Sequence, residues 1–415
     1  MAGGEETNGQ RWQHYHTVVL FCLLAVFISY IDRSNISVAA IDMKEQFHWN
    51  ETRKGIVLAS FFVGYMLLQI TSGTLANRFG GWIVLLLAVT WWSFATIITP
   101  PAALLSFPAL IAARLCLGLG EAAVFPASIN MVGRWVPAAE RSRMVALFSS
   151  GVPLGTVISL PATGWLVHHY GWPRPFYVFG AAGLVWAALW LLLVRRGRGV
   201  EVETTVRAID ATGRIPWRRI LGEPAVWALV AAHFAHNWTL YVLLAWMPSY
   251  FHAVFGLSTA AAGLISAAPW LVNFATANIA GSVSGKLIAR GRSATRVRKS
   301  FLGSGLLVGG CFLLLLRAAP SPVAGVIFMC GATGAFGCVL ASFATNSFDI
   351  APRYADVVWS FTNTFATIPG ILGVFITGWL VQHTGGYSAP FFLSAAVVTI
   401  GAFTFLRFGS GERRI

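Results

Sequence analysis

Eight long stretches of the chain contain no Asp, Glu, Lys or Arg, and they predict where it crosses a membrane. They are residues 12–31, 55–77, 79–113, 144–173, 175–194, 224–285, 318–348 and 357–406. About 20 apolar residues span the hydrocarbon core as a helix, so the longer stretches hold two helices joined by a tight turn. We expect such a turn at Pro100-Pro101, between the third and fourth helices. Continuous apolar runs exclude a membrane barrel, whose strands alternate apolar and polar residues.

These stretches predict an all-α membrane protein with twelve transmembrane helices. We expect the helices at 14–40, 54–77, 82–99, 104–132, 142–166, 173–195, 225–250, 258–287, 299–317, 322–348, 355–380 and 388–408. The first apolar run is too long for a cleavable signal peptide and has no small-residue cleavage site. We therefore expect it to remain as the first helix.

The composition agrees with a protein that is mostly immersed in lipid. Only 11% of its 415 residues are charged and 56% are hydrophobic, whereas soluble domains carry about 25% charged residues. So few charges cannot cover a surface that faces water. We expect a multi-pass integral membrane protein that is embedded in the lipid bilayer.

The net charge of +14 has an uneven distribution along the chain. Of 29 Lys and Arg residues, 22 lie in the termini and alternate loops, five in the opposite loops and two inside predicted spans. Basic residues accumulate in cytoplasmic loops, so we expect both termini in the cytoplasm and the protein in the cell (inner) membrane. The charge is thus explained by topology, and no nucleic-acid partner is expected.

The five cysteines give no sign of a disulfide or a metal site. All of them lie within predicted helices, without the spacing of metal ligands, at positions 22, 116, 311, 330 and 338. The sequence also lacks Gly-x-Ser-x-Gly, a phosphate-binding loop and His-Glu-x-x-His. We therefore expect no metal, no cofactor and no enzymatic activity.

The chain divides into two halves of six predicted helices. The longest hydrophilic stretch predicts an N-terminal bundle at 1–195, a cytoplasmic linker at 196–223 and a C-terminal bundle at 224–415. Gly164-Trp-Leu-Val-His-His-Tyr-Gly matches Gly378-Trp-Leu-Val-Gln-His-Thr-Gly at an offset of 214 residues. Six helices separate the copies, so both run in the same orientation. Parallel six-helix repeats around a central site are the architecture of one large class of transporters.

The segment Gly73-Thr-Leu-Ala-Asn-Arg-Phe-Gly resembles the signature Gly-x-Leu-x-Asp-Arg-x-Gly of the major facilitator superfamily. In that superfamily the signature lies between the second and third helices, where it contributes to a cytoplasmic gate. Asn77 stands at the position of the usual acidic residue. The resemblance implies the major facilitator fold of two six-helix bundles, with one gate contact weakened.

Within this superfamily, the chain resembles the anion:cation symporter group, which includes bacterial sugar-acid permeases, sialin-like proteins and phosphate/anion transporters. Seven segments carry the resemblance in the same order along the chain. They are residues 30–39, 60–65, 113–127, 134–143, 236–241, 349–355 and 363–370. The resemblance implies secondary active transport of an anion.

Four ionisable residues lie deep within predicted spans, where each costs several kcal/mol unless it has a partner or a function. They are Asp32 and Arg33 in the first helix, and Arg114 and Glu121 in the fourth. Arg114 and Glu121 are two turns apart on one helix face, roughly 10 Å along the axis, so we expect them to pair directly or through water. Adjacent Asp32 and Arg33 cannot point the same way, so one is expected to face a cavity and the other a neighbouring helix.

Two arginines that line a cavity are typical of a carboxylate site, because the planar guanidinium group matches a carboxylate. A nearby Asp or Glu adds a group that can release and regain a proton. The resemblance implies that Arg33 and Arg114 contact the anion and that Asp32 and Glu121 carry protons. The alternative is that the four residues only form salt bridges between helices.

Several polar residues are further candidates for contact with the substrate. Tyr30, Tyr65, Tyr241 and Asn363 lie in segments that match the anion:cation symporter group, although Tyr is also an interfacial anchor. His233 and His236, one turn apart in the seventh helix, suggest a proton relay, but packing or hydrogen bonding is the favoured interpretation.

The hypothesis that follows is a proton-coupled symporter of a small organic anion, such as a sugar acid, that works as a monomer. Sodium-coupled or exchange transport of phosphate or a dicarboxylate is an alternative, as is a multidrug exporter of the same fold. Arginines in the cavity would repel cationic drugs. A membrane enzyme or sensor has no catalytic set or output domain in this sequence to support it.

Overall fold

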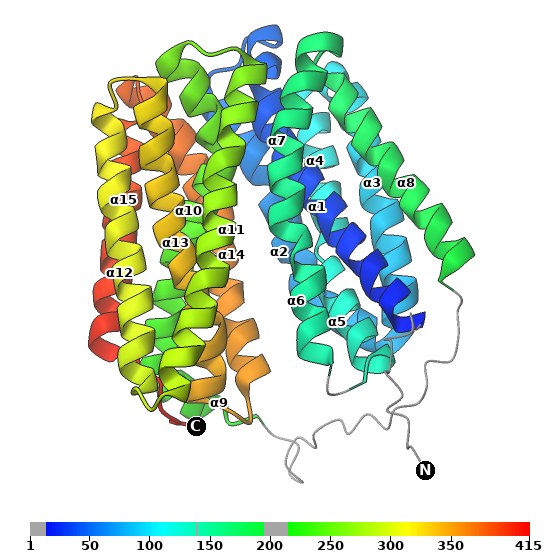
Figure 1. The fold of residues 1–415 in the computed structure, drawn as a ribbon. Helices are drawn as coiled ribbons and strands as arrows, with labels where there is room; N and C mark the ends of the chain where they lie inside the picture. The colour runs from blue at the N-terminus through cyan, green and yellow to red at the C-terminus, as the bar shows by residue number, and fades with distance from the viewer. Residues whose placement is uncertain (1–13, 138–139, 195–214) are drawn as a thin grey trace, which may run out of the picture.

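The structure, a computed structural model, describes residues 14–137, 140–194 and 215–415, nearly all of them helical (Figure 1). The first half contains α1 (His14–Gln46), α2 (Glu51–Phe79), α3 (Gly81–Leu105), α4 (Phe107–Glu121), α5 (Val124–Trp135), α6 (Arg141–Ser149), α7 (Gly151–Tyr170) and α8 (Pro173–Leu193). The second half contains α9 (Trp217–Gly222), α10 (Pro224–Phe255), α11 (Thr259–Ala289), α12 (Ala294–Leu315), η1 (Leu316–Ala318), α13 (Pro322–Ile350), α14 (Ala355–Thr384) and α15 (Ser388–Phe408).

These helices confirm the predicted all-α membrane fold. Within the described residues, eleven helical segments are long and apolar enough to cross a membrane. The two parts of α2, which meet at a bend of 51° after Gln69, make a twelfth span when they are counted together. Two of the eleven spans consist of a pair of α-helices, α4 with α5 and α6 with α7.

Proline accounts for the breaks inside these two spans, which the sequence analysis did not predict. Pro126 lies in the first turn of α5, and Pro153 lies in the first turn of α7. A proline ring clashes with the carbonyl group four residues earlier and provides no N–H group to the helix. The predicted helix at 104–132 therefore ends at Glu121 and restarts at Val124. The predicted turn at Pro100-Pro101 is wrong, because both prolines lie inside α3, which continues to Leu105.

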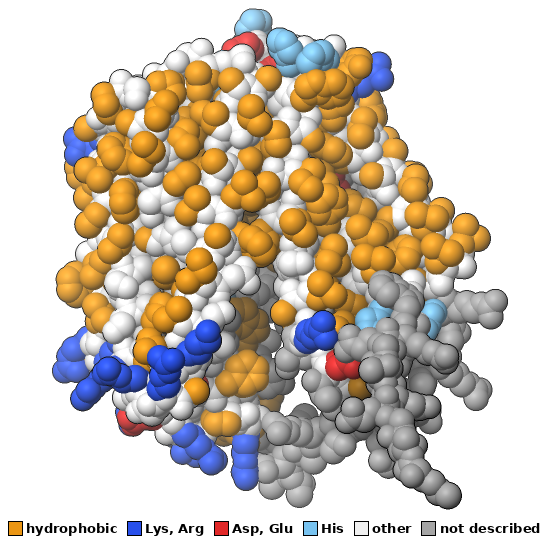
Figure 2. Space-filling model, in the orientation of Figure 1, with side chains coloured by type: hydrophobic (Ala, Val, Ile, Leu, Met, Phe, Trp, Pro, Cys, Tyr) orange, Lys and Arg blue, Asp and Glu red, His pale blue; other side chains and the backbone are white. Residues whose placement is uncertain are grey.

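The helices form two bundles that stand side by side, α1 to α8 in one and α10 to α15 in the other (Figure 1). The predicted boundary at residue 195 and most of the linker at 196–223 lie outside the described residues. The described part of the linker contains the short helix α9, which contacts α10. Large apolar side chains cover the outside of both bundles, as a lipid-facing surface requires (Figure 2).

The two ends of the molecule differ in charge. Lys and Arg side chains gather at the end where α1 begins and α15 ends, which we call the basic end (Figure 2). Figure 2 also shows the surface hollowed between the bundles at the basic end. The other end, which contains the turn between α1 and α2, we call the outer end.

The bundles contact each other closely at the outer end, in two places where a glycine allows the backbones to approach. A methyl group on Gly378 of α14 would lie 2.6 Å from the carbonyl oxygen of Glu51, and one on Gly164 of α7 would lie 3.0 Å from the Cα of Ala260. Gly164 and Gly378 are the equivalent residues of the sequence repeat. Thr259 also donates a hydrogen bond of 2.6 Å to Asp42 across this interface. The molecule is therefore closed at the outer end and open toward the basic end.

Candidate functional site

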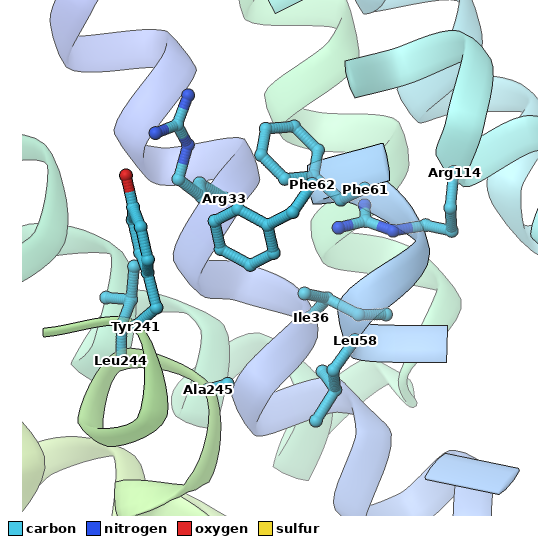
Figure 3. A pocket seen from close by; sticks show the side chains of 9 residues that line it. All are labelled: Arg33, Ile36, Leu58, Phe61, Phe62, Arg114, Tyr241, Leu244 and Ala245. Atoms are coloured by element: carbon cyan, nitrogen blue, oxygen red, sulfur yellow. The ribbon is translucent and has the colours of Figure 1, made fainter. Parts of the chain in front are cut away.

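A pocket lies where the two bundles face each other, and both candidate arginines line it (Figure 3). Helices α1, α2 and α4 of the first bundle and α10 of the second form its wall. The lining residues are Arg33, Ile36, Leu58, Phe61, Phe62, Arg114, Tyr241, Leu244 and Ala245. The pocket thus brings together three of the residues that the sequence analysis selected, from three different helices.

Arg33 is buried and forms an ion pair with Glu121. Its Nη2 lies 3.0 Å and its Nε 3.3 Å from Glu121 Oε2. Ser29, one turn earlier on α1, donates a 2.8 Å hydrogen bond to the same oxygen. The ion pair therefore joins α1 to the end of α4.

This pairing corrects the expectation that Glu121 pairs with Arg114. The two residues share a face of α4, but two helical turns, roughly 10 Å, separate their backbones. Arg33 approaches from the neighbouring helix α1 and reaches the carboxylate without spanning that distance. The partner of Glu121 is thus set by the packing of α1, which spacing along α4 does not reveal.

Three aromatic rings surround the guanidinium group of Arg33. Its Cζ lies 4.7 Å from the ring centre of Tyr30, 4.8 Å from that of Phe61 and 4.8 Å from that of Tyr65. Such rings stabilise a cation by about 0.5–2 kcal/mol each and hold the planar group in one orientation. Two candidate residues, Tyr30 and Tyr65, therefore contact Arg33.

Arg114 is fully buried, and its charge has no hydrogen-bonded partner. Among the described residues, none accepts a hydrogen bond from its Nε, Nη1 or Nη2. Its Cζ lies 5.6 Å from the ring centre of Phe61. A buried charged group without hydrogen-bonded acceptors is costly, yet this one lines a pocket where an anion would provide the missing acceptors.

Asp32 points away from the pocket, as its position next to Arg33 requires. It is fully buried near Trp92 and Thr96 of α3. Neither of its carboxylate oxygens makes a well-formed hydrogen bond to a described residue. Arg114 and Glu121 are close enough to interact with it electrostatically. The four intramembrane charges thus form one group in the first bundle.

The remaining candidates differ in their distance from the pocket. Tyr241 lines it, and its ring lies 4.6 Å from that of Phe62. Asn363 is half-buried on α14 and is not among the lining residues. One turn further along, Thr367 donates a 2.9 Å hydrogen bond to Gln69 of the first bundle. Asn363 therefore lies beside a contact between the bundles.

The sequence analysis missed the apolar part of the site, above all Phe61 and Phe62, as well as Ser29. Both phenylalanines lie in the segment 60–65, which carries part of the family resemblance. That resemblance was the only feature of the sequence that could have identified them as pocket residues. In an apolar chain, however, an aromatic residue of a pocket cannot be distinguished from one that faces lipid.

His233 and His236 lie in the second bundle, outside the pocket. His233 Nδ1 is 3.2 Å from Thr362 Oγ1, and its ring lies 4.5 Å from that of Phe343. His236 is also packed against Phe343, and neither of its ring nitrogens makes a hydrogen bond to a described residue. These surroundings agree with a packing role.

Comparison with known proteins places the chain in a family. The sequence model of the Major Facilitator Superfamily matches residues 22–374. The chain belongs to this superfamily. It is 38% identical to a sodium-dependent phosphate transport protein of the chloroplast of Arabidopsis thaliana, with 98% of this chain and 80% of that protein covered. It is 37% identical to the ascorbate transporter of the same organelle and organism, with 97% and 76% covered.

A solved structure shows the same fold. It is a bacterial homologue of the human lysosomal transporter Spinster in an inward-facing, occupied conformation. It has a TM-score of 0.80 and 20% identity, with 95% of this chain and 96% of that chain covered. The superfamily and the anion-transporting relatives confirm the resemblance that the sequence motifs indicated. The two-bundle fold is that of a transmembrane transporter.

Proposed function

We propose that this member of the superfamily is a proton-coupled symporter of an organic anion, with its binding site between the two bundles. The observation that carries the proposal is Arg114, a buried guanidinium group that lines the pocket without an internal acceptor. Arg33 lies in the same wall. Two guanidinium groups that line one pocket favour an anion and disfavour a cationic drug.

The shape of the site supports a carboxylate as the bound group. A guanidinium group donates two parallel hydrogen bonds to a carboxylate, and this geometry suits a sugar acid or a related compound. Tyr241 provides a hydroxyl group on the side of the second bundle, where hydroxyl groups of such a substrate would lie. A relative that is named an ascorbate transporter agrees with a small organic anion.

The Arg33–Glu121 ion pair supports coupling to protons. A proton on Glu121 would neutralise the carboxylate and release Arg33 to the anion. Loss of the proton would restore the pair at 3.0 Å and displace the anion. Proton and anion therefore each favour the state that accepts the other, which is the thermodynamic requirement for symport. Asp32 would provide a second proton site next to Arg114.

The opening at the basic end supports the proposed orientation. Since basic loops face the cytoplasm, the structure would represent the state that is open to the cytoplasm. Both termini would then lie inside the cell, and the protein in the cell (inner) membrane. The two bundles, at 1–195 and 224–415, would rock around the pocket during transport by a monomer.

Uptake by purified protein in liposomes tests the proposal. Labelled D-gluconate, ascorbate and inorganic phosphate would each be offered with a pH gradient, with a sodium gradient and with neither. We expect accumulation of an organic anion that needs the pH gradient. Accumulation that needs sodium would overturn proton coupling in favour of the alternative that the name of one relative suggests. Transport of cationic drugs alone would overturn the anion site.

A further inference from the structure

A second group of charges lies at the outer end of the molecule, apart from the pocket. Lys44 at the end of α1 lies 2.6 Å from Glu51 Oε1, and Lys54 lies 3.6 Å from Glu51 Oε2. We call these three residues the outer cluster. It combines two cations with one carboxylate, so the outer cluster itself carries one excess positive charge.

Lys54 is the member of the outer cluster that the fold buries. Its exposed fraction is 2%, and its Nζ lies 5.0 Å from the ring centre of Trp246 on α10 in the other bundle. The nearby Glu51 Oε2 makes no hydrogen bond to a described residue. A loose ion pair and an aromatic ring thus hold Lys54. An apolar residue would close this interface without the free-energy cost of burying a charge. The buried charge of Lys54 therefore calls for a functional explanation.

The position of Lys54 relates it to the pocket. Lys54, Leu58 and Phe61 share one face of α2 because they are four and three residues apart. Leu58 and Phe61 line the pocket. On the facing helix, Trp246 follows Leu244 and Ala245, which also line the pocket. Lys54 therefore lies one helical turn, roughly 6 Å, beyond the apolar wall on the way to the outer end.

We propose that Lys54 is an outer anion site, which receives the carboxylate or phosphate group of the substrate before it reaches Arg33 and Arg114. The inference rests on the proposed transport of an anion. When the outer end opens, α2 separates from α10, so Lys54 loses Trp246 but keeps Glu51, its neighbour on the same helix. The excess positive charge then faces the mouth and raises the local concentration of anions.

A purely mechanical role makes a different prediction. The outer cluster could instead serve only to stabilise the closed outer end. Removal of either charge would then destabilise the closed state, so Lys54→Met and Glu51→Gln would change transport in the same direction. If Lys54 binds the anion, the two variants act in opposite directions. Lys54→Met removes the attracting charge, whereas Glu51→Gln removes the carboxylate that competes with the anion for Lys54.

Initial rates of uptake through the outer end would distinguish the two roles. The probes are D-gluconate, ascorbate and inorganic phosphate, offered to right-side-out proteoliposomes. We expect Lys54→Met to raise KM at least about threefold and Glu51→Gln to lower it. Lys54→Arg should keep the wild-type KM. The matched control is Arg53→Met, which removes an exposed cation one residue away and should leave KM unchanged.

Ionic strength provides a second measurement. Salt screens the attraction between Lys54 and the anion, so wild-type KM should rise with salt and the KM of Lys54→Met should rise less. An unchanged KM in Lys54→Met, or a shift of both variants in one direction, would overturn the outer site. If Lys54→Met does not fold, a raised KM in Glu51→Gln would by itself contradict the outer anion site. Wild-type protein that takes up none of the three probes would instead contradict the proposed function.

Discussion

The carboxylate of Glu121 pairs with Arg33 of the neighbouring helix, at 3.0 Å, and leaves Arg114 of its own helix without an acceptor. The two arginines of the pocket are therefore not equivalent. One is held by an internal counter-charge that a proton can neutralise. The other has no internal acceptor, so under the proposed mechanism Arg114 can bind the anion whether or not Glu121 carries a proton.

Glu121→Gln is expected to separate exchange from accumulation. The amide mimics the permanently protonated carboxyl group, so Arg33 is free and the anion still binds. Loaded protein should exchange labelled for unlabelled anion, whereas net uptake driven by a pH gradient should fail because the empty protein cannot restore the Arg33–Glu121 pair. Both are measured in proteoliposomes. The control is Glu412→Gln, whose carboxylate is 70% exposed. Normal accumulation by Glu121→Gln would mean that the Arg33–Glu121 pair is only a structural salt bridge.

Arg33→Lys is expected to impair anion binding although the charge remains. An ammonium group lacks the planar fork of guanidinium and cannot hold two parallel hydrogen bonds to a carboxylate. It also packs differently between the rings of Tyr30 and Tyr65. Stabilisation of purified protein against heat by the transported anion would report the loss. If the variant binds the anion with unchanged affinity, Arg33 is only a partner of Glu121.

Arg114→Met should make the ligand-free protein more stable and abolish its response to the anion. The guanidinium group is fully buried without a hydrogen-bonded partner, and a charged group left in this way costs about 1–3 kcal/mol or more. Thermal unfolding with and without the anion measures both effects. Arg298→Met is the contrasting variant, since Arg298 lies 2.7 Å from Asp349 and its loss should lower stability. A less stable Arg114→Met protein would contradict the assignment.

Gly378→Leu is expected to prevent closure of the outer end. The added side chain would meet the carbonyl oxygen of Glu51 and the ring of Trp246, at 2.6 and 2.9 Å from its first carbon atom. Leu58, now buried, would become reachable from the outer end. A cysteine at position 58, in a background without the native cysteines, would then react faster with a membrane-impermeant maleimide. Gly281→Leu is the matched control, because no atom lies near its added carbon. Equal labelling in both variants would contradict the role of Gly378 in closing the outer end.

The spans could be predicted because the thickness of the bilayer sets their length, and a charge-free run of that length has few other uses. The breaks near Glu121 and Ser150 could not be read from the apolar pattern. They depend on Pro126 and Pro153, and most of the other prolines inside helices of this chain, such as Pro161, are accommodated without a break. A proline therefore marks a place where a helix can end, and packing decides whether it does.

The charged part of the site was also predictable, since Asp32, Arg33, Arg114 and Glu121 stand out in an apolar sequence. Their partners were not, because the Arg33–Glu121 pair joins residues 88 positions apart. Lys54 shows the same limit. Its place next to the turn after α1 suggested a loop charge, and only the packing of the two bundles, with α2 against α14, buries it beside Trp246 of α10.

The pocket draws its charges from one bundle and only uncharged residues, Tyr241, Leu244 and Ala245, from the other. If the proposed mechanism is correct, the charges that bind the anion and couple it to the proton lie in the first half of the chain, and the uncharged residues that contact the rest of the substrate include those of the second half. Substitutions on α10 would then change which anion fits without altering the residues proposed to carry the proton. A chain built in this way can acquire new substrates during evolution, or by design, while its coupling to the ion gradient stays intact.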